Sequence, residues 1–266
     1  MTESIRAMRI RKSIQMTIQK LKIILVLVKR DYAIQFAGSL LGIFWSLVQN
    51  LVLIGVYSVV FFLLDFKSAA NNPDYIPHIF SGLLFWLPIS DFLIRGTGIL
   101  TENRNLIKRS PLGMQLFIWV PYVQYLIHHF VTSIPVFIIL YFLSALSAYF
   151  IFSYFVAACT GLYLLLVLNY LSRLNIILKD ISPLVRLASQ FVFWTLPVLY
   201  FPGGSLLQTI NSYNPLNLPL ELFRIFTLKV ATNEISILPF LLFTLLFLLT
   251  YYLSKTRLNK LVTDHL

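Results

Sequence analysis

Charged side chains are scarce in this sequence and are missing from its longest uninterrupted stretch. Asp, Glu, Lys and Arg make up 12% of the 266 residues, about half the share that is typical of a soluble protein. The 61 residues from Leu112 to Ser172 contain none of them. A bilayer core requires about 20 apolar residues in helical form, so this stretch is long enough for two transmembrane helices and a turn. Backbone polar groups in lipid must bond within their own segment, which predicts helices here.

Residues that support catalysis are also few. The single cysteine, Cys159, lies within an apolar run, so no disulfide can form inside the chain and we expect a buried structural thiol. There is no Gly-x-x-x-x-Gly-Lys-Ser/Thr phosphate-binding loop and no Gly-x-Ser-x-Gly motif. His128 and His129 are adjacent, so they face different sides of a helix and lack a metal-binding spacing. The sequence therefore predicts no catalytic, cofactor or metal site in this chain.

What remains is a series of apolar segments separated by charged ones. We expect six transmembrane helices, at about Leu40–Leu64, Ile76–Ile99, Leu112–Leu143, Ser147–Leu168, Leu184–Tyr200 and Ile235–Ser254. The predicted fold class is an all-α integral membrane protein with six spans, an N-terminal amphipathic interface helix, and re-entrant short helices between spans five and six. Residues 1–36 would form the cytoplasmic tail and interface helix, and residues 37–266 the transmembrane domain.

Lys and Arg are strongly biased to one side of this arrangement. With both termini inside, 18 of the 21 basic residues lie on the cytoplasmic face, and only Lys67, Arg224 and Lys229 fall outside. The positive-inside rule therefore predicts a multi-pass protein with cytoplasmic N- and C-termini. The same bias accounts for the formal net charge of +11, so we expect membrane lipids and no nucleic acid as its counterpart.

Two charges lie inside the second predicted span. Asp91 and Arg95 are separated by one helical turn. Because charge within a membrane is costly, we expect them to pair with each other or to face a polar cavity.

Apolar residues recur every three or four positions ahead of the first span. The set is Ile14, Ile18, Leu21, Leu25, Val28 and Tyr32. Lys and Arg residues flank this stripe, which indicates a helix lying in the membrane interface with its cations toward the headgroups. The pattern fits either a simple membrane anchor or a docking surface for a cytosolic partner.

The segment between spans five and six combines turn signals with short apolar pieces. Pro202-Gly203-Gly204 and Asn211–Pro215 are typical of turns, whereas Ser205–Ile210 and Leu216–Val230 are short for a full crossing. We expect two short helices that dip back from the outer side over about residues 202–232. Irregular backbone at that depth indicates a transport pathway. A hairpin lying on the outer membrane surface is the alternative.

Aromatic residues are the one clear surplus, with 23 Phe, 14 Tyr and 4 Trp. Many are expected in belts at the two membrane interfaces. The pair Phe85-Trp86 and residues 194–201 lie where the outer half of a pore wall would be. Aromatic ring faces pack against sugar rings through apolar and C–H contacts.

Short motifs in order along nearly the whole chain resemble those of ABC-2-type polysaccharide-export permeases. The opening motif is Arg30-Asp31 followed by Gly38-Ser39-Leu40-Leu41-Gly42-x-x-Trp45-Ser46-Leu47. The later matches are Tyr75, 82–86, 103–108, 179–181, 196–202, Asn214-Pro215-Leu216 and Arg224. Members of this family are the membrane subunits that export O-antigen, capsule or teichoic acid.

The resemblance implies a permease that exports a lipid-linked, O-antigen-like polysaccharide across the plasma membrane, the inner membrane of a bacterium. It implies a homodimer bound to two nucleotide-binding ATPase subunits, so that ATP and Mg bind the partner ATPase and this chain is not an enzyme. Export of another amphiphile or drug by the same architecture is the first alternative. A membrane-embedded transferase acting on lipid-linked glycans is the second, but the acidic residues here are scattered and not convergent.

The resemblance also implies roles for particular residues. Candidates for coupling to the ATPase are Lys29, Arg30, Asp31, Glu102, Asn103, Arg104, Asn105, Lys108 and Arg109. Candidates for the channel wall and for sugar contact are Trp45, Phe85, Trp86, Trp194, Tyr200, Phe201 and Tyr213. Candidates for an outer gate are Pro202, Gly203, Gly204, Asn214, Pro215 and Arg224.

Overall fold

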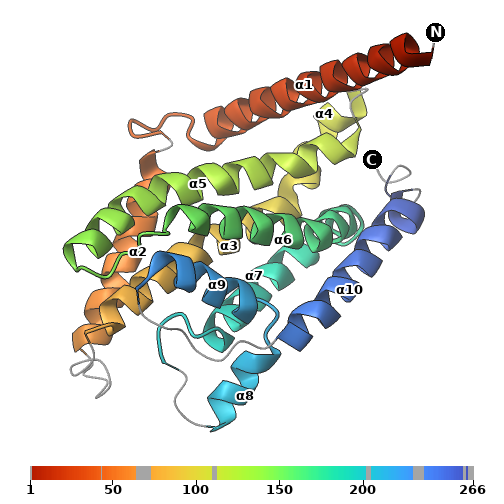
Figure 1. The fold of residues 1–266 in the computed structure, drawn as a ribbon. Coiled ribbons are helices and arrows are strands. Elements are labelled where there is room, and N and C mark those ends of the chain that lie inside the picture. Colours follow the sequence, from red (N-terminus) through yellow and green to blue (C-terminus); the bar gives the residue numbers. More distant parts are fainter. Residues whose placement is uncertain are drawn as a thin grey trace.

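Helices account for most of the chain in the computed structural model, which describes residues 2–42, 44–63, 73–109, 113–201, 205–229, 237–259 and 262. In chain order they are α1 (Thr2–Gln35), α2 (Phe44–Leu63), α3 (Tyr75–Glu102), α4 (Arg104–Arg109), α5 (Met114–Phe142), α6 (Ile151–Ile177), α7 (Ile181–Thr195), α8 (Ser205–Tyr213), α9 (Asn217–Thr227) and α10 (Ile237–Leu253). A short π-helical turn, Ser254–Leu258, follows α10. The all-helical expectation is confirmed for these residues (Figure 1).

In the part of the chain that the structure describes, four helices are long and apolar enough to cross a membrane. They are α3, α5, α6 and the segment Ile237–Thr256 that contains α10, and they make the chain a multi-pass membrane protein. The expected six spans are not confirmed. The apolar part of α2 that the structure describes is Leu47–Val60. Helix α7 has 15 residues, which is about 22 Å of helix against a hydrocarbon core of about 30 Å.

The shortness of α7 has a local cause. The fifth span was expected to reach Tyr200, but the helix ends at Thr195. Pro197 has no backbone N–H and its ring disfavours the helical conformation of the residue before it. Leu196 accordingly has φ −92° and ψ 142°, which is extended backbone. The chain from Leu196 to Phe201 therefore turns across the bundle instead of continuing the helix.

Helix α6 differs from its prediction in the opposite way. It continues past the expected end at Leu168 to Ile177 and carries Arg173 in its last turns. The Arg173 guanidinium is buried and donates to the carbonyl oxygen of Asn169 at 2.8 Å, and to the side-chain oxygens of Gln115 and Asn259 at 3.2 Å each. Because these donors find partners inside the protein, the charge does not end the helix.

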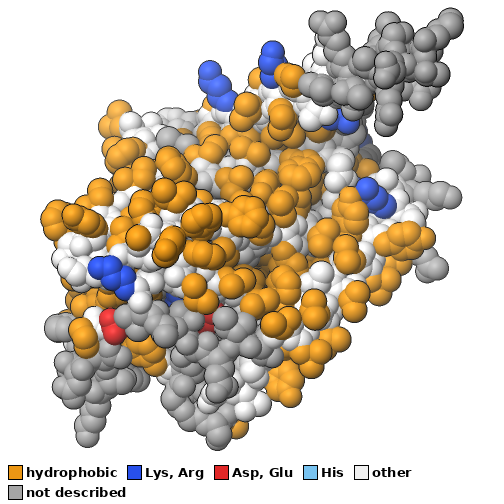
Figure 2. Space-filling view, in the orientation of Figure 1, with side chains coloured by type: hydrophobic (Ala, Val, Ile, Leu, Met, Phe, Trp, Pro, Cys, Tyr) orange, Lys and Arg blue, Asp and Glu red, His pale blue; other side chains and the backbone are white. Residues whose placement is uncertain are grey.

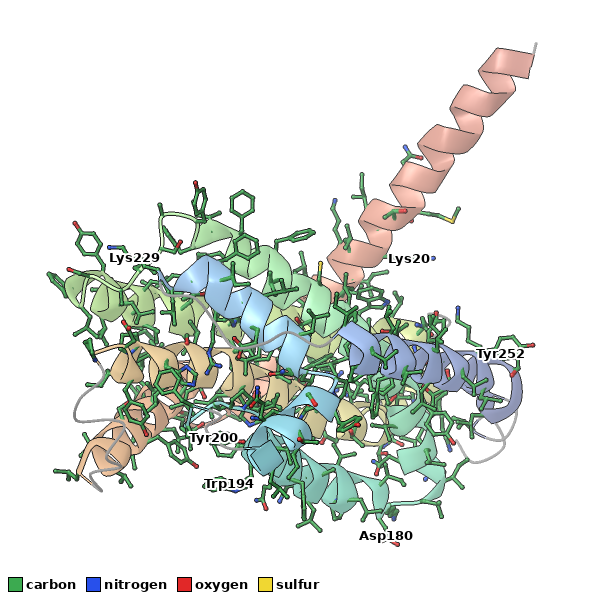
Figure 3. The ribbon with its side chains drawn as sticks, turned by 60° about the horizontal axis from the view of Figure 1, so that its bottom comes forward. Lys20, Asp180, Trp194, Tyr200, Lys229 and Tyr252 are labelled. Atoms are coloured by element: carbon green, nitrogen blue, oxygen red, sulfur yellow. The ribbon has the colours of Figure 1, made fainter. Side chains whose placement is uncertain are left out.

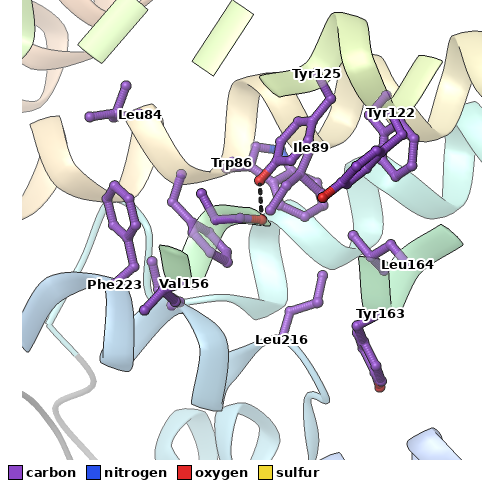
Figure 4. Packing of buried hydrophobic residues seen from close by; sticks show 14 of the residues in the cluster. Leu84, Trp86, Ile89, Tyr122, Tyr125, Val156, Tyr163, Leu164, Leu216 and Phe223 are labelled. Carbon is purple, nitrogen blue, oxygen red and sulfur yellow. Dashed lines mark hydrogen bonds between the residues drawn. The ribbon is translucent and has the colours of Figure 1, made fainter. Parts of the chain in front are cut away.

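Helix α3 lies at the centre of the bundle. It packs along α5 and α6, and α2, α7 and α9 cover its remaining sides. Figure 4 shows Leu84, Trp86 and Ile89 of α3 among side chains from α5, α6 and α9. The Tyr125 hydroxyl on α5 donates to the Ala157 carbonyl on α6 at 3.0 Å. These contacts hold α3 firmly, and several of the candidate functional residues lie on it or against it.

The C-terminal part of α1 packs against α5, whereas its N-terminal part extends away from the bundle (Figure 1, Figure 3). Its buried residues are Ile24, Leu27 and Val28, so the face against the bundle is not the predicted stripe. Of that stripe, Val28 is buried, whereas Leu21 and Leu25 are 55% and 57% exposed. The side chain of Ile14 lies outside the described residues. The exposed part of the stripe remains available to a membrane interface.

The face of the molecule drawn in Figure 2 is largely hydrophobic, with Lys and Arg side chains toward its margins. Cys159 was expected to be buried but is exposed. It follows Phe155 by one turn and precedes Leu162 by three residues on α6, and both neighbours are exposed as well. The thiol therefore lies on an outward apolar face, where lipid would cover it.

Candidate functional site

The end of α1 meets the junction of α3 and α4. Arg30 Nη1 donates to Asn103 Oδ1 at 3.0 Å. Asp31 Oδ2 accepts from Arg95 Nη2 at 2.9 Å and from Gln124 Nε2 at 2.7 Å. The structure thus brings together the two segments in which sequence analysis placed the ATPase-coupling candidates.

The candidates at this junction differ in what they expose. Asn103 is buried, and its amide also donates to the Ile99 carbonyl at 3.0 Å, so its side chain holds α1 against α3. Ile107 anchors the short helix α4 in the core. The exposed charged or polar candidates are Lys29, Arg30, Glu102, Arg104, Asn105, Lys108 and Arg109. The result is an exposed surface of mixed charge at one end of the bundle.

Asp91 and Arg95 do not pair with each other. Arg95 binds Asp31 and also contacts Gln35. Asp91 Oδ2 instead lies 3.5 Å from His128 Nδ1 on α5. Pairing within α3 was the wrong alternative, because two neighbouring helices bring better-placed partners; the expected polar cavity is present beside Asp91.

At the other end of the bundle a buried charge cluster joins α9 to α3. Arg224 Nη1 donates to Glu221 Oε1 at 3.0 Å, and both side chains are at most 1% exposed. Arg224 Nη2 donates to the Pro197 carbonyl at 2.7 Å and lies 3.0 Å from His78 Nε2. Burial lowers the pKa of the Arg224 guanidinium, and the adjacent Glu221 opposes that shift. We refer to Arg224, Glu221, His78 and the Pro197 carbonyl as the outer knot.

Further bonds fix the turn after α7 to the same place. His78 Nε2 lies 3.0 Å from the Pro197 oxygen and 3.1 Å from the Tyr200 oxygen. The Tyr75 hydroxyl donates to the Leu199 carbonyl at 3.1 Å. Backbone groups that Pro197 prevents from joining a helix are thus satisfied by side chains of α3.

The far end of α9 is held by backbone pairing. Leu146 and Leu228 form an antiparallel bridge. Ser147 N donates to the Thr227 oxygen at 2.9 Å, and Lys229 N donates to the Ala145 oxygen at 3.1 Å. The C-terminal half of α9 is therefore held twice, to α3 by Arg224 and to the α5–α6 turn by residues 227–229.

Helix α8 is attached more lightly. It lies at the edge of the bundle (Figure 1) and leaves Leu206 and Tyr213 73% and 69% exposed. The Tyr200 hydroxyl lies 3.2 Å from Asn211 Oδ1 and 3.1 Å from the Trp194 carbonyl oxygen, so its one proton can go to either acceptor. Figure 3 shows Tyr200 and Trp194 close together near α8. Burial raises the pKa of Tyr200, and the Asn211 bond opposes that rise.

The gate candidates differ in how firmly the structure holds them. Asn214 is buried and donates to Thr195 Oγ1 at 2.9 Å, and its own side-chain oxygen accepts from Leu216 N at 3.0 Å. Pro215 is half-buried beside it. Arg224 belongs to the outer knot. Pro202, Gly203 and Gly204 lie outside the described residues.

The aromatic candidates are not equivalent either. Phe85 is buried and packs against Phe223, so it is a core residue. Trp86 is 3% exposed but borders a cavity of about 300 Å³, as does Trp194, which is 58% exposed. The Phe201 ring is tilted against the His78 ring, with the ring centroids 4.2 Å apart. Trp45, at 44% exposed, lies at the start of α2.

Sequence reasoning missed Glu221 and His78 as parts of the outer knot. Glu221 and Arg224 are opposite charges three residues apart within an otherwise apolar helix, a spacing that places both on one face. This spacing could have indicated the ion pair from the sequence alone. His78 lies 146 positions from Arg224, and nothing in the local sequence indicates their contact.

Comparison with known proteins agrees with the resemblance. The chain is 22% identical over 201 residues to the O-antigen export system permease protein RfbA of Klebsiella pneumoniae, which covers 73% of this chain and 75% of that protein. It is 24% identical over 180 residues to the protein of that name from Myxococcus xanthus, covering 67% and 68%. No protein-family model matches the chain. The resemblance to polysaccharide-export permeases is thereby confirmed.

Proposed function

We propose that this chain is the membrane-spanning permease subunit of an ABC transporter that exports a lipid-linked, O-antigen-like polysaccharide. Two copies would form the channel in the bacterial inner membrane, with both termini cytoplasmic, and two separate ATPase chains would bind ATP and Mg. The observation that carries the proposal is the similarity, over about 70% of the chain, to permeases named for O-antigen export.

The junction of α1, α3 and α4 supports a coupling role. Its exposed charges lie on the side that the positive-inside rule assigns to the cytoplasm. Its partly buried bonds, Arg30 to Asn103 and Asp31 to Arg95, tie α1 to the central helix. A force applied to α4 by a partner would therefore reach α3 directly. We propose that Glu102 and the basic residues of α4 contact the ATPase. Charges of both signs at such an interface fix the relative position of the two chains more than they strengthen their binding.

The contacts at the outer end of the bundle support a gate in which only one segment moves. The turn after α7 and helix α9 are fixed by the outer knot and by the bridge to the α5–α6 turn, whereas α8 has few attachments. We propose that residues 203–230 fold into the outer half of the membrane and close the pore at rest. Opening would displace α8 about Asn214, since gating motions concentrate at a few residues where segments end.

Export of another amphiphile or drug by the same architecture is the second candidate. The specific observation in its favour is an apolar cavity of about 400 Å³ lined by α7, α10 and residues 213–216. A drug exporter would confer resistance without changing surface glycan, whereas a glycan exporter would do the reverse.

The test is genetic and biochemical. The chain is deleted in its own host, and surface glycan is measured by lectin binding to intact cells beside total glycan in lysed cells. The proposal predicts loss of surface glycan with retention of the lipid-linked pool, and rescue by the intact chain but not by Glu102→Lys. Normal surface glycan in the deletion strain refutes the function, and full rescue by Glu102→Lys refutes only the coupling role of that residue.

A further inference from the structure

A partly polar, open cavity of about 530 Å³ lies against the central helix α3 and is used by none of the roles above. Its polar lining consists of Gln35, Gln49, Asn50, Ser90, Asp91 and His128. These residues come from α1, α2, α3 and α5, so the cavity is formed by long-range packing. Its volume lies within the range of about 300–1,000 Å³ that is usual for ligand sites.

The cavity holds two groups that are costly at this depth. Asp91 and His128 lie near the midpoints of α3 and α5, two of the helices long enough to cross a membrane. The Asp91 side chain is 47% exposed and that of His128 only 6%, and both residues line the cavity. An ionisable residue within a membrane is expensive and is retained where it faces an aqueous or ligand-filled space.

His128 has unused hydrogen-bonding capacity. Its Nδ1 faces Asp91 at 3.5 Å, and its buried Nε2 has no hydrogen-bond partner among the described residues. The Tyr32 ring lies behind it, with ring centroids 5.7 Å apart. A buried polar atom without a partner is rare in a folded protein and calls for a water or a ligand.

Aromatic rings line the neighbouring cavity along the same face of α3. That cavity, of about 300 Å³, shares Leu87, Ser90 and Ile94 with the polar one and is bordered by Tyr57, Trp86 and Trp194. The Ser90 and Ser189 hydroxyls, 2.7 Å apart, join α3 to α7 between them. The polar cavity therefore presents carboxylate, amide and imidazole groups beside ring faces, while the cation of Arg186 lines only the neighbouring cavity.

We propose that Asp91, His128, Gln49 and Asn50 form a hydroxyl-binding subsite for one uncharged pyranose unit of a transported glycan. This inference rests on the proposed function. A carboxylate accepts bonds from two adjacent hydroxyls, amides both donate and accept, and ring faces pack against the C–H faces of the sugar. The Asp91 charge disfavours uronate or phosphate groups, so the subsite selects neutral sugars.

The test measures binding without ATP and without export. The full chain is placed in lipid nanodiscs, because maltoside detergents carry sugar headgroups. Tryptophan fluorescence is followed while mannotriose, galactotriose, chitotriose or the anionic trigalacturonate is added. We expect saturable quenching by at least one neutral trisaccharide and binding at least about tenfold weaker for trigalacturonate.

Variants locate the signal. Asp91→Asn keeps the size of the side chain and removes its charge, and His128→Gln keeps polarity. Each should weaken binding about fivefold to tenfold, as expected for losing one ordinary hydrogen bond. Asp180→Asn makes the same chemical change at an exposed position outside both cavities and should bind like the original chain. Size-exclusion profiles verify that each variant is folded.

Three outcomes overturn the subsite: no saturable quenching by any neutral trisaccharide, unchanged binding in both cavity variants, or equal binding of trigalacturonate. A failure of the proposed export function would be seen in a different experiment. In that case the deletion strain displays normal surface glycan, whatever the nanodisc titration gives.

Discussion

Replacing Arg224 by Met removes the centre of the outer knot. The change leaves Glu221 with 0% exposure and without its cation. It also removes the donor to the Pro197 carbonyl at 2.7 Å. Removing one partner of a buried ion pair costs about 3–5 kcal/mol, which is a large share of the total stability of about 5–15 kcal/mol of a typical folded protein.

The expected result is a loss of thermal stability by Arg224→Met. For a chain of this size each kcal/mol shifts the melting temperature by about 2–4 °C, so a decrease of about 6–20 °C is predicted. It would be measured by heating the detergent-solubilised protein and following the folded peak by size exclusion. Lys229→Met is the matched control, because the Lys229 side chain is exposed and donates to the Ser144 carbonyl, while its backbone bond is kept by the substitution. This variant should melt within about 2 °C of the original.

A double variant tests the charge argument itself. Glu221→Leu with Arg224→Met removes both charges, and replacing a buried pair by apolar residues is close to neutral. It should recover more than half of the lost melting temperature. If Arg224→Met melts with the original, or if the double variant is as unstable as the single one, the outer knot does not hold α9 in the way proposed here.

Three other changes follow from the same contacts. Gly82→Ala should destabilise the turn after α7, because its Cβ would lie 2.7 Å from the Val198 oxygen, whereas Gly55→Ala meets nothing within 4 Å and should be tolerated; melting temperatures of the two variants decide this. Asp31→Asn with Arg95→Met, compared with each single change in a double-mutant cycle, should show coupling in ATPase-driven export, and additive effects would contradict it. A disulfide engineered between α8 and α7 should stop export while the ATPase still assembles; normal export with the crosslink complete would support the surface hairpin instead.

The sequence predicted helix positions well wherever lipid-like composition decides the structure. The expected third span, Leu112–Leu143, is observed as Met114–Phe142, and the two short helices after α7 are present. Boundaries failed where tertiary contacts override composition. The fourth span was expected to end at about Leu168, yet α6 continues to Ile177 and the Arg173 side chain is bonded inside the protein.

The bonding partners of individual side chains were the feature that the sequence predicted least well. Asp91 and Arg95 are neighbours in sequence, but each finds its partner on another helix. The end at Thr195 was foreseeable from Pro197, whereas the placement of the freed carbonyls against His78 and Arg224 was not. Contacts between residues more than 100 positions apart depend on how the helices pack. Local sequence patterns do not indicate that packing.

The central claim is that this chain conducts a lipid-linked glycan when a separate ATPase hydrolyses ATP. The most direct measurement reconstitutes the permease with its ATPase in liposomes loaded with the host's lipid-linked glycan, and follows ATP-dependent arrival of the glycan at the far leaflet with a membrane-impermeant glycosidase. The proposal predicts arrival that requires ATP, the permease and the ATPase together. Equal arrival without the permease, or none when all three are present and ATP is being hydrolysed, would contradict it.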